Sequence, residues 1–175
     1  MSDFLRLQAR LETADKRIGF FRVIPEGITM VSYLHKHLCA GHMIIRPEPV
    51  GLCAARRQVT MLAKELGFTE DDATDIVIAV GEAMSNAYLY GTPDLSRNYI
   101  YLGWHCSDDI LSITIDDEGQ GIVYEKQELR PCKLTEFRGN GLPLMRKTMD
   151  NVRFDYIDGT TVVLEKRMPG LRLSS

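Results

Sequence analysis

Apolar residues recur at helical spacing in two consecutive stretches near the middle of the chain. The first stripe advances by three and four residues at a time and stops at Gly67, which predicts a helix. Its members are Leu52, Ala55, Val59, Leu62 and Leu66. The second stripe lies within residues 75–91, and Thr69 with Asp71 and Asp72 supplies capping chemistry before it. Its members are Ile76, Val80, Ala83 and Ala87.

Strand patterns dominate the rest of the chain and flank one more helix. Strands are predicted at residues 98–106, 110–116, 152–156 and 160–168. Residues 141–151 predict a helix with Pro143 in its first turn. The last two strands are joined by Asp158-Gly159, which suits a type I′ hairpin turn. This order predicts an α+β fold, a two-layer sandwich with helices on one face of a mixed, largely antiparallel sheet.

The first 41 residues have a different pattern. The predicted elements there and just beyond are an amphipathic helix at 4–11, a strand at 18–24, a helix at 29–39 and a strand at 42–46. We therefore divide the chain into an N-terminal extension (residues 1–41), a main domain (42–170) and a tail (171–175). The extension is either an interaction arm or additional packing.

A cluster of metal-binding residue types lies at the end of this extension. Within eight residues the chain contains His35, His37, Cys39 and His42. On a strand the first three would share a face, whereas on a helix His35, Cys39 and His42 would do so. Zinc accepts such ligands, but no second half-site follows. The alternatives are a metal site and a polar helix end.

Composition narrows the class of protein. The 175 residues suffice for one domain with a sizeable core, and 45% hydrophobic with 26% charged residues is typical of a soluble globular chain. A net charge of −3 without a basic run gives no case for nucleic-acid binding. No signal peptide and no apolar run of about 18 residues is present, so we expect no membrane association. The four cysteines are then expected to be reduced, in the cytoplasm.

Three polar residues lie along a second line of the helix predicted at residues 75–91. Glu82 and Asn86 are one turn apart, and Tyr90 follows one turn later. A carboxylate and a carboxamide are costly to bury without partners. They therefore belong either to a solvated face or to a site.

Two glycine clusters provide further candidate chemistry. Residues 116–121 read Asp-Asp-Glu-Gly-Gln-Gly, which places a carboxylate at a strand end beside a tight turn. Residues 138–145 read Arg-Gly-Asn-Gly-Leu-Pro-Leu-Met and open a helix, whose free N–H groups suit a phosphate. Residues 123–137 between the clusters are polar and are expected to form a mobile lid over a ligand. The pattern is not a P-loop.

Four segments in this order resemble the GHKL superfamily of ATP-binding domains, and most closely its anti-sigma-factor serine/threonine kinases. They are GEAMSNA, IDDEGQGI, GNGLPLMRKTMD and DGTTVVLEKR. The resemblance covers residues 43–168 and implies the Bergerat ATP-binding fold of that superfamily. One difference stands out, because the related kinases usually have His-Gly where this chain has Tyr90-Gly91.

The resemblance implies a role for each candidate residue at the base end of a nucleotide. Asp117 would accept a hydrogen bond from the adenine amine. Gly119 and Gly121 would shape the adenine pocket. Thr160 or Thr161 would support Asp117 through a hydroxyl group or a water molecule.

At the phosphate end the implied roles are catalytic. Glu82 would be the general base, Asn86 would hold Mg²⁺, and Tyr90 would lie near the nucleotide. The phosphates would be wrapped by Gly139, Gly141 and Leu142, and Arg138 would contact the γ-phosphate.

The implied function is an ATP- and Mg²⁺-dependent kinase that phosphorylates a Ser or Thr of an anti-anti-sigma (STAS) partner and also binds a sigma factor. The alternative is an ATP-binding protein-interaction switch with little or no phosphoryl transfer, which Tyr90 favours. A detached histidine-kinase catalytic domain is a third reading. Related proteins often dimerise, so a homodimer is compatible with each reading.

Overall fold

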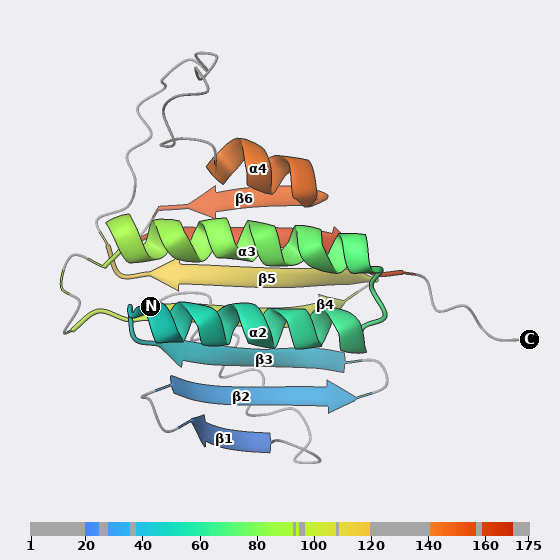
Figure 1. Cartoon of the computed structure of the whole chain (residues 1–175), viewed down its shortest axis with the longest axis horizontal. Helices are drawn as coiled ribbons and strands as arrows, with labels where there is room; N and C mark the ends of the chain where they lie inside the picture. The colour runs from blue at the N-terminus through green and yellow to red at the C-terminus, as the bar shows by residue number, and fades with distance from the viewer. Residues whose placement is uncertain are drawn as a thin grey trace, which may run out of the picture.

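A seven-stranded antiparallel sheet forms one layer of the molecule (Figure 1). The computed structural model describes residues 20–24, 28–35, 38–92, 94, 97–107, 109–119, 141–156 and 159–169, with side chains from residue 40 onward. The strands are β1 (Phe20–Ile24), β2 (Ile28–His35), β3 (Leu38–Ile45), β4 (Ile100–Ser107), β5 (Ile110–Asp117), β6 (Asn151–Asp155) and β7 (Thr161–Arg167). They are arranged in the order β1-β2-β3-β4-β5-β7-β6, and each neighbouring pair is antiparallel.

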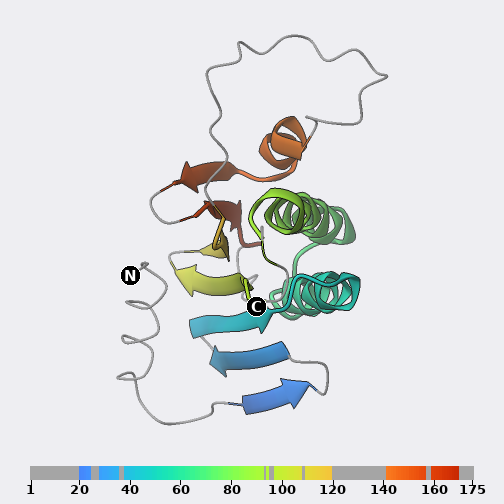
Figure 2. The same cartoon turned by 90° about the vertical axis from the view of Figure 1, so that its left-hand side faces the viewer.

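Three helices of the described residues form the second layer. They are α2 (Pro49–Glu65), α3 (Glu70–Tyr90) and α4 (Gly141–Thr148). Figure 2 shows all three on the same face of the sheet. The predicted α+β sandwich with helices on one face is therefore confirmed.

Local sequence explains where the two long helices begin and end. Pro49 occupies the first turn of α2, where its missing N–H has no helical partner, and Gly67 ends that helix region with a φ of 78°. The Thr69 side chain accepts a hydrogen bond from the Asp72 backbone N–H at 3.1 Å and caps α3. Both predicted apolar stripes face the sheet and are centred on buried residues: Ala55, Val59, Leu62, Ile76, Val80, Ala83 and Ala87.

Two predictions of secondary structure are wrong. Residues 29–39 are predicted as a helix, but residues 29–35 belong to β2 and residues 38–39 to β3, and these two strands pair with each other. The β-branched and aromatic residues Thr29, Val31 and Tyr33 favour the extended form once a neighbouring strand is available. The helix predicted over residues 141–151 ends at Thr148, and Asn151 already begins β6.

The sheet continues across the boundary that the sequence pattern placed between residues 41 and 42. That boundary lies inside β3, whose residues pair with β2 on one side and β4 on the other. The predicted helix at residues 4–11 lies outside the described residues.

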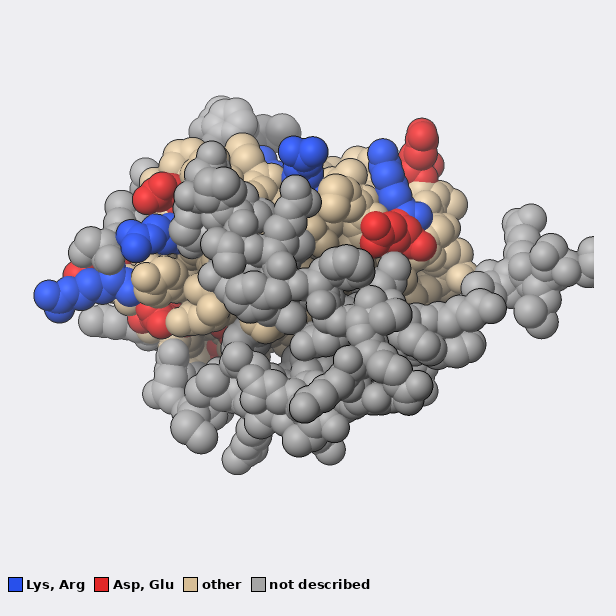
Figure 3. All heavy atoms as spheres, turned by 90° about the horizontal axis from the view of Figure 1, so that it is seen from below, with Lys and Arg blue, Asp and Glu red and all other residues tan. Residues whose placement is uncertain are grey.

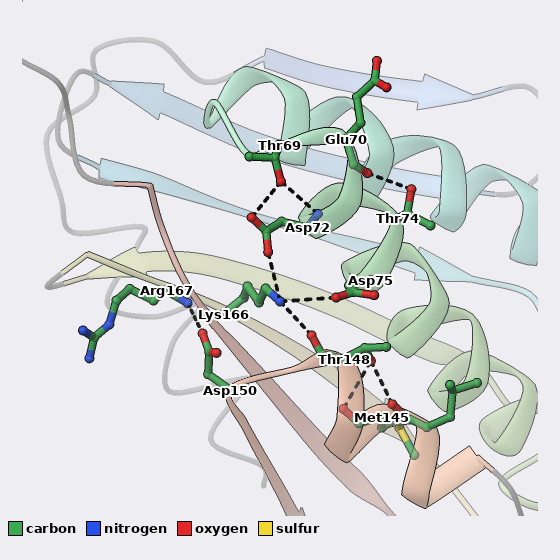
Figure 4. Close-up of polar contacts among 11 residues, drawn as sticks. Thr69, Glu70, Asp72, Thr74, Asp75, Met145, Thr148, Asp150, Lys166 and Arg167 are labelled. Carbon is green, nitrogen blue, oxygen red and sulfur yellow. Dashed lines mark hydrogen bonds and ion pairs between the residues drawn. The ribbon is translucent and has the colours of Figure 1, made fainter.

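One lysine joins three elements near the N-terminal end of α3 (Figure 4). Lys166 Nζ on β7 donates a hydrogen bond to the Thr148 carbonyl oxygen at 2.8 Å, at the C-terminal end of α4. The same nitrogen lies 3.2 Å from Asp72 Oδ1 and 3.6 Å from Asp75 Oδ2, both on α3. The Lys166 side chain is only 12% exposed, whereas the two aspartates are about 40% exposed. Lys166 therefore ties α4 to α3 and to the sheet.

Replacing Lys166 with Met is expected to lower the free energy of unfolding by about 1–2 kcal/mol. Most of the loss arises because the Thr148 carbonyl loses its donor, since ion pairs with exposed carboxylates contribute little. Urea unfolding measures the change. Lys147→Met, which removes an exposed lysine on the same short helix, is the matched control. Equal stability of the two variants would contradict this role for Lys166.

The described surface mixes charges of both signs. On the face in Figure 3 the coloured basic and acidic side chains are interspersed. In the described part of the chain, no helix combines the length and the apolar character needed to cross a bilayer.

Candidate functional site

Helix α3 carries a half-buried polar pair on its C-terminal half. Glu82 and Asn86 are one turn apart, and both side chains are partly accessible. Around them α3 buries small apolar residues, including Ala83 and Ala87. Among the described residues neither polar side chain has a hydrogen-bond partner, and both remain accessible to water. Their polar atoms are therefore available to a ligand.

The N-terminus of α4 lies directly against this pair. A Cβ atom added to Gly141 would lie 3.1 Å from Glu82 Oε2 and 3.5 Å from Asn86 Nδ2. Met145, one turn further along, is fully buried and fixes the helix against the core. The first N–H groups of a helix have no helical partners and carry partial positive charge. The structure thus brings a carboxylate, a carboxamide and the N-terminus of a helix together.

A second cluster lies where β5 ends. Asp117 is 8% exposed, and its Oδ1 accepts hydrogen bonds from the backbone N–H groups of Gly119 at 3.0 Å and Thr160 at 3.1 Å. Burial raises the pKa of Asp117 above its usual value, and these two N–H groups partly oppose the rise. The other carboxylate oxygen, Oδ2, faces Gly91. One oxygen is therefore held by the protein, and the other is oriented toward a loop.

Glycine is required where that loop meets the turn after Asp117. A Cβ atom at Gly119 would lie 2.6 Å from the Gly91 Cα, and one at Gly91 would overlap the Asp117 carboxyl group. Backbone atoms cannot yield such space cheaply. Gly91 was predicted only as the end of a helix. Its position after Tyr90, one turn beyond Asn86, is the signal that could have identified it as part of the site.

The structure distinguishes between the two candidate threonines. Thr160 is 5% exposed; its backbone N–H donates to the Asp117 carboxylate, and its carbonyl oxygen accepts from the Asp117 backbone N–H at 3.0 Å. The Thr160 hydroxyl also lowers the pKa of Asp117, although within the described part of the chain its Oγ1 makes no hydrogen bond of ordinary geometry. Thr161 pairs with Asp116 and lies on the sheet face away from the helices. A buried hydroxyl beside Asp117 that lacks a partner is a group that a ligand could satisfy.

The two clusters are connected by α3 itself. Asn86 and Gly91 are five residues apart, which corresponds to about 7.5 Å along a helix axis. A base held at Asp117 and phosphates held at Gly141 are therefore separated by a distance that one nucleotide can bridge. The residue types fit ATP and its metal, because an amide oxygen suits Mg²⁺ and a carboxylate suits an amine.

Other predicted site residues have different outcomes. Tyr90, the last residue of α3, is 56% exposed, and Leu142 on α4 is partly buried against the core. Gly121, Arg138, Gly139 and the predicted lid at residues 123–137 lie outside the described residues.

His35 and His42, which would share a face on a helix, do not lie on a helix. Residues 35 and 42 lie on neighbouring strands, where His35 is opposite Leu38 and His42 is opposite Val31. Four residues of strand separate these positions by about 13 Å. The prediction of a polar helix end is wrong because the segment is a hairpin. In the part of the chain whose side chains are described, no three potential ligands gather around a common point.

Comparison with known proteins agrees with this geometry. Residues 45–166 match the family described as the histidine kinase-like ATPase domain. The chain is 30% identical over 154 residues to the serine-protein kinase RsbW of Bacillus velezensis, covering 83% of this chain and 91% of the relative. It is 32% identical over 120 residues to the anti-sigma F factor of Bacillus subtilis, covering 65% and 82%.

A solved structure shares the fold. It contains the RsbU and RsbW domains of a Mycobacterium tuberculosis protein and matches with a TM-score of 0.57 and 21% identity, covering 74% of this chain and 32% of that one.

Proposed function

The chain belongs to the histidine kinase-like ATPase family, in the group of RsbW serine-protein kinases and anti-sigma F factors, and from this membership we propose that it is an ATP-dependent protein serine/threonine kinase. Its substrate is a Ser or Thr hydroxyl of a STAS-type anti-anti-sigma partner. The protein also binds a sigma factor, and both activities take place in the cytoplasm. A homodimer is compatible with both activities.

The observation that supports this proposal most is the contact between Gly141 and the polar pair of α3. Glu82 is close enough to the N-terminus of α4 to meet a hydroxyl group that approaches phosphate bound there. Phosphoryl transfer needs chiefly positioning and charge neutralisation, and both are supplied by groups held on helices packed against one core.

Each residue then has a defined task. Asp117 Oδ2 accepts a hydrogen bond from the adenine amine, with the Thr160 hydroxyl beside it. Asn86 holds Mg²⁺, which neutralises phosphate charge when bound. Glu82 takes the proton from the attacking hydroxyl, whose oxygen forms a bond to the γ-phosphorus while ADP leaves.

The remaining residues of the proposal surround the nucleotide. The backbone of Gly139, Gly141 and Leu142 wraps the phosphates, and Arg138 contacts the γ-phosphate. Gly119 and Gly121 shape the adenine pocket, and Tyr90 lies at its outer edge.

Two measurements test the proposal. Calorimetry measures ATP binding with and without Mg²⁺, and a second assay measures transfer of the labelled phosphate from γ-³²P-ATP to purified STAS proteins of the same organism. We expect Mg²⁺-dependent binding and label on one Ser or Thr of a STAS partner. No binding would refute the nucleotide site. Binding without transfer to any STAS protein would instead support an ATP-dependent interaction switch, in keeping with the exposed Tyr90 at the position where related kinases usually have His.

A further inference from the structure

The residue after Asp117 makes an unusual set of contacts for an exposed carboxylate. Glu118 Oε2 accepts hydrogen bonds from Asn98 Nδ2 at 3.2 Å and from the Tyr99 backbone N–H at 3.0 Å, and Oε1 accepts from the Tyr101 hydroxyl at 3.0 Å. All three donors lie 17–20 residues earlier in the chain, at the start of β4. Glu118 therefore connects two segments that the sequence keeps apart.

The segment that Glu118 holds has its own hydrogen-bonded turn. The Asp94 carbonyl accepts from the backbone N–H groups of Arg97 and Asn98, and Asp94 N donates to Asn98 Oδ1 at 2.8 Å. The Asn98 amide thus contacts the turn through its oxygen and Glu118 through its nitrogen. Asn98 and Tyr99, which lead into β4, are thereby anchored to Glu118.

The C-terminal end of α3 touches the proposed adenine site. Gly91 directly follows this helix, and it lies against both Asp117 and Gly119. At this end Thr92 is held to α3, because its hydroxyl donates to the Tyr88 carbonyl oxygen at 2.8 Å. The turn at residues 117–119 is therefore held on two sides, by Gly91 at the end of α3 and by the Glu118 contacts with the residues that lead into β4.

The Tyr101 hydroxyl is a dependable donor in this arrangement. Burial, with a further contribution from Glu118, raises the pKa of Tyr101 to about 12. The hydroxyl group consequently remains protonated in any ordinary assay buffer, and the hydrogen bond to Glu118 persists across that range.

We propose that Glu118 is a positioning residue for base recognition, which fixes the turn of residues 117–119 against Asn98, Tyr99 and Tyr101 and so directs Asp117 toward an adenine amine. Glu118 itself does not contact the base. The inference rests on the proposed function, because it concerns the selectivity of the same nucleotide site.

Selectivity between ATP and inosine triphosphate tests it, because inosine has a carbonyl group in place of the adenine amine. We expect the wild-type protein to bind ATP at least about tenfold more tightly, the effect of one hydrogen bond to a charged group. Glu118→Ala should reduce this ratio to below threefold, mainly by weakening ATP binding. Tyr101→Phe, which removes one of the three donors, should give an intermediate ratio.

Glu65→Ala, which removes an exposed carboxylate at the end of α2, is the matched control and should keep the wild-type ratio. An unchanged ratio in Glu118→Ala would overturn the inference, even if that variant bound both nucleotides more weakly, since equal weakening indicates a purely structural role. If Glu118→Ala fails to fold, Tyr101→Phe is the deciding variant. A reduced ratio of ATP to inosine triphosphate affinity in Tyr101→Phe would support the inference, and an unchanged ratio would overturn it. A wild-type protein without any ATP preference would refute the adenine site itself, and with it the proposed function.

Discussion

Asp117→Asn is expected to weaken ATP binding by about 100-fold or more while leaving the protein at least as stable as the wild type. In the variant the amide oxygen can still accept from the N–H groups of Gly119 and Thr160, so the turn is retained. The amide nitrogen then replaces Oδ2, the oxygen that faces Gly91. A donor would meet the adenine amine, which is also a donor, so the hydrogen bond is replaced by a repulsive contact.

Whereas ATP affinity falls in Asp117→Asn, its free energy of unfolding should equal or exceed that of the wild type, because burial raises the pKa of Asp117. A raised carboxyl pKa means that the folded state binds the proton more tightly than the unfolded state. The wild-type protein therefore loses stability as the pH rises from the unfolded pKa through the folded pKa, and Asp117→Asn lacks that loss. ATP binding by the wild type should weaken as the pH falls through the same acidic range, because the acceptor becomes protonated.

Calorimetry and thermal unfolding of the same two proteins measure both effects. Asp155→Asn, an exposed carboxylate at the end of β6, serves as the control and should alter neither. Wild-type affinity for ATP in Asp117→Asn would mean that the base is recognised elsewhere.

The sequence predicted those parts of the fold that depend on local patterns. The helical stripes of α2 and α3, the cap at Thr69 and the strands from β4 to β7 all follow from spacing and turn residues within a few positions of one another. Residues 29–35 and 38–39 did not, because their strand conformation depends on pairing between β1, β2 and β3. Thr29, for example, pairs with Ile44, and the apolar spacing within residues 29–39 does not contain that information.

The residues of the candidate site also divide into those that local motifs predicted and those that only the structure identifies. Glu82, Asn86, Asp117 and Gly141 were predicted from motifs, and the structure brings Glu82 and Asn86 to Gly141. Gly91 and Glu118 were missed as site residues because their importance lies in contacts across 17 or more residues of chain. Which of Thr160 and Thr161 supports Asp117 could not be decided from sequence either, since a one-residue shift of register exchanges the two faces of a strand.

Glu82→Gln is expected to lower the rate of phosphoryl transfer by about 10²- to 10⁴-fold while ATP affinity stays within about threefold of wild type. Glutamine has nearly the same shape, so it preserves the contact with Gly141, but its amide cannot take a proton from the attacking hydroxyl. Adenine and the metal are held by Asp117 and Asn86 in the proposed mechanism, and neither depends on the charge of Glu82.

Single-turnover transfer to the STAS partner, measured beside calorimetry, separates the two quantities. Asp71→Asn removes an exposed carboxylate from the first turn of the same helix and should leave the rate unchanged, which controls for the altered charge of α3. An equal loss of ATP affinity and rate in Glu82→Gln would assign Glu82 to nucleotide binding. A wild-type rate would instead place the general base on another residue, and the contact between Glu82 and the N-terminus of α4 would then serve only to position that helix.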